Sequence, residues 1–105
     1  MKKEEIILGI KKTGLMAIVR VDTVERGYEI AQGCLDGGVN VLEISYTNNN
    51  AGEVISALKK KYKEDLLVGA GTVLDGTTAR LAIMSGAQFI IAPCYDDGVA
   101  QICNL

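Results

Sequence analysis

Glu43 is the residue whose position in this chain most suggests chemistry. It stands inside the run Val39-Asn40-Val41-Leu42-Glu43-Ile44-Ser45, which otherwise has the composition of a buried strand. Removing water from a carboxylate is costly unless a charged partner or a proton compensates. Glu43 is therefore either paired with an arginine inside a sheet or kept for a function such as proton transfer.

Polar or small residues also stand at the ends of the other apolar runs. Arg20 closes the first run, Ser45 and Thr47 close the run that contains Glu43, Gly71 and Thr72 follow the third, and Pro93 follows the fourth. In barrel enzymes the carboxyl ends of the strands carry the active site. Agreement among four strand ends predicts one site at that edge of the fold.

The elements that would position these residues alternate along the chain. Helices are predicted over 3–13, 51–63, 76–85 and 96–103, and strands over 15–21, 39–45, 66–70 and 88–92. A further helix is predicted to start at Asp22, with Glu25 as its capping-box partner, and to stop at Gly37-Gly38. This alternation is typical of parallel βα architecture, either an open sheet or a barrel.

The strand ends favour the barrel. An open dinucleotide-binding sheet would carry GxGxxG after its first strand, whereas Asp22-Thr23-Val24 stands there. A whole barrel needs about 200 residues or more. We therefore predict an α/β fold consisting of the (βα)4 half of a TIM (βα)8 barrel with a leading helix, as a single domain over residues 1–105.

Four sequence blocks together resemble the KDPG/KHG aldolase family, the bacterial enzymes that cleave 2-keto-3-deoxy-6-phosphogluconate and 4-hydroxy-2-oxoglutarate. The blocks are Ala17-Ile-Val-Arg20, Gly37-Gly-Val-Asn-Val-Leu-Glu-Ile-Ser-Tyr-Thr47, Val68-Gly-Ala-Gly-Thr-Val-Leu74 and Gly86-Ala-Gln-Phe-Ile-Ile-Ala-Pro93. The resemblance covers essentially the whole chain. It implies class I aldolase chemistry, in which a lysine Schiff base allows carbon–carbon cleavage to pyruvate and an aldehyde.

The resemblance also implies roles for individual residues. Glu43 would be the catalytic acid–base group, with a pKa raised by burial. Four residues would bind the substrate: Arg20, Thr47, Thr72 and Pro93. Thr72 would hydrogen-bond the pyruvyl carboxylate, and the turn at Pro93 would lie against the same end of the substrate. Some family members carry an arginine just after the glutamate strand, where this chain has Tyr46-Thr47-Asn48. Arg20 is expected to take over that role, as a bidentate carboxylate ligand.

The resemblance departs from the family at the Schiff-base lysine, which lies on the sixth strand of the family barrel. All eight lysines here fall on predicted helices or helix ends, where no desolvation to lower a pKa is expected: Lys2, Lys3, Lys11, Lys12, Lys59, Lys60, Lys61 and Lys63. The isolated chain is therefore expected to be inactive. A half-barrel would also expose its inner face and two sheet edges, so pairing of half-barrels, or a homo-oligomer as in the family, is expected.

Composition limits the remaining classes. The chain has 105 residues, net charge −2, no histidine and three cysteines without CxxC spacing. No nucleic-acid or membrane partner, metal or cofactor is expected, and reduced thiols are typical of a cytoplasmic protein. The expected partner is a small 2-keto acid. Two alternatives stay open: another phosphate-binding TIM-barrel enzyme, such as an epimerase or a thiamin-phosphate-synthase-like protein, and a non-catalytic half-barrel that acts as an assembly unit.

Overall fold

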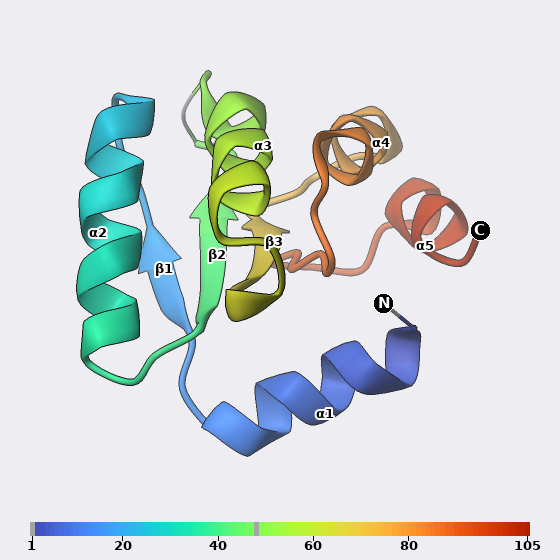
Figure 1. Cartoon of the computed structure of the whole chain (residues 1–105). Helices are drawn as coiled ribbons and strands as arrows, with labels where there is room; N and C mark the ends of the chain where they lie inside the picture. Colours follow the sequence, from blue (N-terminus) through green and yellow to red (C-terminus); the bar gives the residue numbers. More distant parts are fainter. Residues whose placement is uncertain (1, 48) are drawn as a thin grey trace.

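The computed structural model describes residues 2–47 and 49–105 of the chain. Its elements are α1 (Lys3–Thr13), β1 (Ala17–Val19), α2 (Val24–Asp36), β2 (Val41–Ser45), α3 (Ala51–Tyr62), a 3-10 turn (Lys63–Asp65), β3 (Leu67–Gly71), α4 (Gly76–Ser85) and α5 (Asp97–Cys103). Helices and strands alternate through β3 (Figure 1). Within the described residues no helix has both the length and the apolar character needed to cross a membrane.

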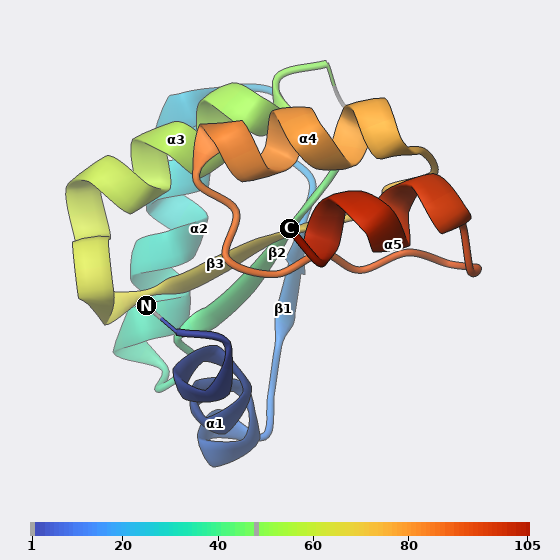
Figure 2. The ribbon, with the colours of Figure 1, turned by 90° about the vertical axis from the view of Figure 1, so that its right-hand side faces the viewer.

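The three strands form one parallel sheet in the order β1-β2-β3. Ile18 lies beside Glu43, and Glu43 lies beside Gly69. Helices α2, α3 and α4 cover one side of this sheet, while α1 crosses near the amino ends of the strands (Figures 1 and 2). β1 is shorter than the predicted 15–21 because only Ala17–Val19 find partners on β2.

The helix-facing side of the sheet holds the hydrophobic core. Val19, Leu42, Ile44, Val68 and Ala70 are buried there, at alternate positions of their strands, against residues of the covering helices. Burial of apolar area contributes roughly 25 cal/mol per Å2. The side chains at the intervening positions therefore lie on the opposite face, which we call the inner face: it includes Ile18, Glu43, Ser45, Gly69 and Gly71.

The expectation of an exposed inner face is wrong for β2 and β3. Val41, Ser45 and Leu67 are buried, and Glu43 is only 7% exposed. Part of the cover comes from α1, where the Leu67 side chain packs so closely on Gly9 that a Cβ there would lie 2.6 Å from Leu67 Cδ1. Ile18 on the edge strand is 59% exposed, as predicted for a strand with one neighbour.

The predicted strand 88–92 does not form as a regular strand. It makes one isolated parallel bridge, between Ala70 and Ile90. The Gln88 side chain explains part of the difference, because its Oε1 atom accepts a hydrogen bond from the Val68 backbone N–H at 3.1 Å and another from Lys59 Nζ at 2.9 Å. The Val68 N–H thus donates to a side chain, whereas in a regular parallel ladder it would donate to a backbone carbonyl of the neighbouring strand.

The N-terminus of α2 also differs from the prediction. Thr23, not Asp22, is the N-cap, and its hydroxyl accepts a hydrogen bond from the Arg26 N–H at 3.1 Å. The helix therefore begins one residue later than the predicted box of Asp22 and Glu25 requires. Asp and Thr are both preferred N-cap residues, and Asp ranks slightly higher, so residue type alone does not indicate that Thr23 is the cap.

Replacing Thr23 by alanine should lower the free energy of unfolding by about 1 kcal/mol, because one N–H of the first turn of α2 loses its acceptor. Urea-induced unfolding followed by circular dichroism measures this. Thr23→Ser is the matched control: it keeps the hydroxyl and should retain most of the stability. An equal loss in both variants would show that the methyl group, not the cap, is responsible.

Candidate active site

Glu43 lies in the middle of the sheet, on the inner face of β2. Burial raises the pKa of its carboxyl, and the positive charge of Arg20 partly lowers it again. Among the described residues Glu43 has no ion-pair partner, since the ion pair found there joins Arg26 to Glu29 on the surface of α2. The reading of Glu43 as half of a buried Arg–Glu pair is therefore wrong. Desolvation raises a carboxyl pKa because it disfavours the charged form, and a carboxyl with a raised pKa is better able to hold and return a proton.

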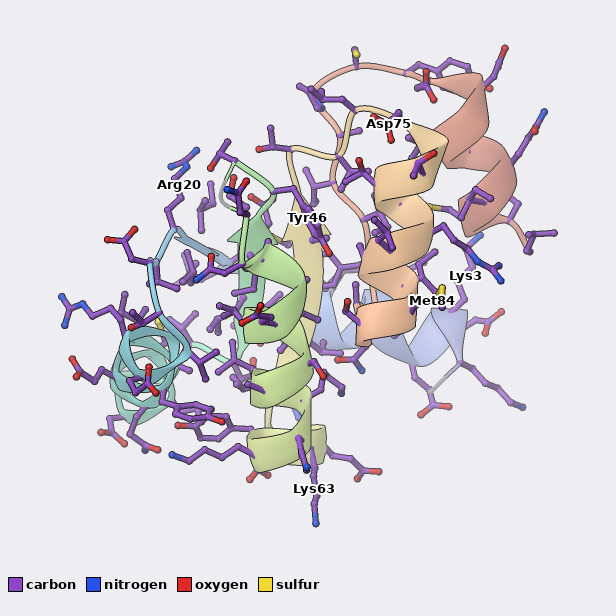
Figure 3. The ribbon with its side chains drawn as sticks, turned by 90° about the horizontal axis from the view of Figure 1, so that it is seen from above. Lys3, Arg20, Tyr46, Lys63, Asp75 and Met84 are labelled. Atoms are coloured by element: carbon purple, nitrogen blue, oxygen red, sulfur yellow. The ribbon has the colours of Figure 1, made fainter. Side chains whose placement is uncertain are left out.

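Arg20 follows β1 directly and is exposed. Viewed along the strands from their carboxyl ends, its side chain points away from the ribbon into solvent (Figure 3). Its charge reaches Glu43 only through space. An exposed guanidinium at this rim is free to bind an anionic group, which leaves its predicted role as a carboxylate ligand open.

Three hydroxyl groups meet at the carboxyl end of β2 and the turn after β3, and one of them belongs to Ser45, two residues after Glu43 on the same face. Ser45 Oγ lies 3.1 Å from Thr47 Oγ1 and 3.2 Å from Thr72 Oγ1, so it joins the end of β2 to the residue that follows β3. Ser45 is buried, Thr72 half-buried and Thr47 exposed. We call these three residues the hydroxyl chain. Sequence reasoning placed Ser45 at a strand end without assigning it to the site; its position two residues after Glu43, on the same face, was the available signal.

Thr72 has an unusual backbone, with φ of 55°. A β-branched residue in the left-handed region is a genuine outlier and costs about 1–3 kcal/mol. Its hydrogen bond to Ser45 is one of the interactions that accompany this conformation. The turn directs the Thr72 hydroxyl back towards β2, and such strain is found most often at functional sites.

The other predicted residues lie at the rim. Thr47 lines a hollow of about 330 Å3 together with Asp22, Asn49 and Asn50. Pro93 is exposed and follows Ile91, whose N–H donates to Ala70 O on β3 and whose carbonyl accepts from Val73 N–H just after β3. Of the stretch Tyr46-Thr47-Asn48, Tyr46 packs against the core and Asn48 lies outside the described residues. The structure thus brings Thr47 and Thr72 together through Ser45.

Lys59 corrects one expectation about the lysines. Burial lowers the pKa of its ammonium group, although no lysine was expected to be desolvated enough to lower its pKa. Its Nζ atom donates to Gln88 Oε1, whose other donor is the Val68 N–H near the amino end of β3. Glu43 and the hydroxyl chain lie towards the carboxyl end of the sheet. Lys59 therefore ties α3 to the 88–92 segment and is not placed to act with Glu43.

Replacing Arg20 by glutamine should raise the pKa of Glu43 further, because the substitution removes the charge that favours the carboxylate. Titration of the Glu43 carboxyl carbon by NMR measures this. Arg26→Gln removes another exposed arginine, on α2, and should leave the Glu43 pKa unchanged. An unchanged or lower pKa in the Arg20 variant would contradict the assignment.

The raised pKa also predicts how stability depends on pH. The folded state holds the Glu43 proton more tightly than the unfolded state, so this contribution is fully present below the ordinary glutamate pKa and is lost as pH rises through the folded pKa. Glu43→Gln, which stays neutral, should remove that part of the pH dependence. Urea unfolding at pH values on both sides of the window tests this, and identical pH profiles for the two proteins would refute it.

The fold is a parallel βα arrangement in which the Glu43 side chain reaches from the middle of β2 to Gly71 at the carboxyl end of β3, and barrel enzymes carry their active sites at that edge. The family model described as KDPG and KHG aldolase matches residues 6–105, so the chain belongs to the KDPG/KHG aldolase family. Membership confirms the resemblance seen in the sequence blocks.

Individual relatives agree with the family. The 2-dehydro-3-deoxy-phosphogluconate aldolase of Treponema pallidum is 30% identical over 98 residues, which are 93% of this chain and 46% of that protein. The structure of the Zymomonas mobilis ZM4 aldolase with 3-phosphoglycerate superposes with a TM-score of 0.85 at 24% identity, covering 98% of this chain and 48% of the other. A Legionella pneumophila KDPG aldolase, solved with pyruvate captured as a covalent carbinolamine intermediate, gives a TM-score of 0.77 at 24% identity, covering 83% and 42%. The chain thus spans about half the length of the relatives that it matches.

Proposed function

We propose that residues 1–105 form the N-terminal half-barrel of a class I aldolase that cleaves a 2-keto-3-deoxy-6-phospho sugar acid or 4-hydroxy-2-oxoglutarate to pyruvate and an aldehyde. The observation that carries the proposal is the buried Glu43, which has no ion-pair partner in the part of the chain that the structure describes, on the same face as the hydroxyl chain in a member of the KDPG/KHG aldolase family. The coverage of about half of each relative supports the half-barrel.

Glu43 is the acid–base group in this proposal. Its burial brings the carboxyl pKa towards the working range, so that one group can both accept and return a proton as the carbonyl adduct forms and the carbon–carbon bond breaks. The lack of an ion-pair partner supports this role, because a paired carboxylate would be held in its charged form.

The substrate-binding residues are Arg20, Thr47, Thr72 and Pro93. Hydroxyl groups and a guanidinium donate hydrogen bonds, and a substrate carboxylate accepts them. Ser45 holds the Thr72 and Thr47 hydroxyls on one side of Glu43, which supports a carboxylate site there. Arg20 at the rim adds positive charge. The 2-keto carbon would then lie next to Glu43, where its proton is needed.

The Schiff-base lysine would come from a segment beyond residue 105. Lys59 is the lysine whose pKa burial lowers, and its contacts hold it at the other end of the sheet. The covalent pyruvate intermediate of the Legionella pneumophila relative supports amine chemistry in the family. The remaining half-barrel would therefore be the partner of this chain, either in one polypeptide or through pairing, and the complete barrel would form a homo-oligomer.

Borohydride trapping with pyruvate tests the proposal. The chain is studied alone and together with the C-terminal half of the Treponema pallidum relative, joined in one polypeptide so that assembly is assured. Reduction should attach pyruvate to a lysine of the added half only, and the joined protein should cleave 2-keto-3-deoxy-6-phosphogluconate. Trapping of pyruvate on this chain alone would contradict the proposal that the Schiff-base lysine belongs to the other half. A joined protein that folds but does not cleave the substrate would favour the alternative of a non-catalytic assembly unit.

A further inference from the structure

Two glycines of β3 lie on the inner face next to Glu43. In the parallel register Glu43 lies beside Gly69, and Ser45 lies beside Gly71. Both glycines are buried, and neither has the positive φ that requires a glycine, unlike Gly14, Gly38 and Gly86. Glycine is therefore needed at these two positions because neighbouring atoms leave no room for a side chain, and not because of the backbone conformation.

The Glu43 side chain occupies the space that a side chain at position 71 would need. A Cβ on Gly71 would lie 2.5 Å from Glu43 Cγ and would also overlap Cδ and Oε2. Real carbon–carbon contacts begin well beyond this, at about 3.5 Å. The carboxyl therefore extends from β2 across β3 and rests directly on the Gly71 backbone.

The Phe89 ring uses Gly69 in the same way. A Cβ on Gly69 would lie 2.5 Å from Phe89 Cγ and would overlap two further ring atoms. Backbone hydrogen bonds fix this segment on β3: Ala70 N–H to Phe89 O at 3.0 Å and Gln88 N–H to Val68 O at 2.8 Å. Alternate positions of a strand are separated by roughly 6.6 Å, two rises of about 3.3 Å. The ring and the carboxyl are thus neighbours on one face.

We propose that Gly71 and Phe89 are positioning residues for Glu43: Gly71 supplies the flat surface on which the carboxyl rests, and Phe89, lying over Gly69, forms the apolar wall on the side towards the amino ends of the strands. The wall and the glycine surface together hold the carboxyl towards the carboxyl ends of the strands, where the hydroxyl chain lies. The positive charge of Arg20 also acts on this carboxyl, through space. The value of this arrangement for catalysis rests on the proposed function, but the arrangement itself does not.

A double-mutant cycle on thermal unfolding tests the Gly71 contact. Gly71→Ala should lower the melting temperature strongly, and the same substitution in a Glu43→Ala background should lower it much less, because all three overlapping atoms are gone. Gly33→Ala on α2, where no atom lies within 4 Å of the new methyl group, is the matched control and should show no coupling to Glu43→Ala. An equal loss from Gly71→Ala in both backgrounds would overturn the proposal. If Gly71→Ala alone fails to fold, a folded double variant supports the proposal and an unfolded one overturns it.

The pKa of Glu43, measured by NMR, is the readout that a merely structural role would not move. Phe89→Leu should lower this pKa towards the ordinary glutamate value, since a smaller wall admits water, and Phe89→Tyr should largely keep it raised. Ile91→Leu, at an exposed position of the same segment, should leave it unchanged. An unchanged Glu43 pKa in Phe89→Leu would overturn the role of the ring. None of these measurements uses a substrate. The positioning proposal could therefore hold if the proposed function failed, and the proposed function could hold if the positioning proposal failed.

Discussion

Replacing Glu43 by glutamine in a complete barrel that contains this segment should lower kcat/KM for cleavage by about 100- to 10,000-fold, the range typical for loss of a positioned acid–base group. Glutamine has nearly the same shape and places no charge in a buried site, so the fold should persist. The loss would then report the proton transfer. Steady-state cleavage of 2-keto-3-deoxy-6-phosphogluconate, followed through the pyruvate released, measures it.

Glu29→Gln is the matched control for that experiment. Glu29 lies on the surface of α2, where its side chain is 65% exposed and pairs with Arg26. The same chemical change at this position should leave kcat/KM within about twofold, since surface substitutions away from a site have small effects. If the Glu43 variant retained full activity while folded, Glu43 would not be the acid–base group.

Replacing Leu42 by alanine should lower the free energy of unfolding by about 2–5 kcal/mol. Leu42 is fully buried on the helix-facing side of β2, the strand that pairs with both of its neighbours. A cavity there lies at the centre of the core and cannot be filled by a small shift of one element. Because domains are typically stable by only about 5–15 kcal/mol, the variant should populate unfolded forms measurably. Urea-induced unfolding of the variant and of the unchanged protein gives the difference in their free energies of unfolding.

Leu8→Ala makes the same substitution on α1, where the side chain is 64% exposed. Its effect should stay within about 0.5 kcal/mol. If both substitutions lowered the free energy of unfolding by similar amounts, Leu8 would be buried against a further surface in solution. The core beneath the helices would then not be the main source of stability.

Local signals predicted most of the helices well. The ranges 3–13 and 76–85 are observed as predicted, because each has a regular apolar spacing and a glycine directly after its last residue. The strand 88–92 was predicted from an equally apolar run, yet only Ile90 forms a bridge. Strand formation depends on the partner, and here the Gln88 side chain takes a donor of that partner. The cap of α2 shifted from Asp22 to Thr23 for a similar reason, since two adjacent residues could both serve.

The candidate site was predictable only in part. A carboxylate inside an apolar run signals burial by itself, and the structure confirms that Glu43 is buried. Within residues 2–47 and 49–105 it has no arginine ion-pair partner, and this could not be read from the sequence, because pairing depends on where the Arg20 side chain points. The bond between Ser45 and Thr72 joins residues 27 positions apart, so it required the register of β2 and β3.

The sequence by itself determined the alternation of elements, the burial of Glu43 and the family, because these depend on residue type and on spacing along the chain. Only the tertiary structure decided what surrounds the carboxyl. It placed Gly71 beneath Glu43, Phe89 over Gly69 and Leu67 against α1. These are contacts across strands, and their geometry is set by register and by the space that a missing Cβ leaves. No local pattern along the chain encodes which side chain will occupy that space.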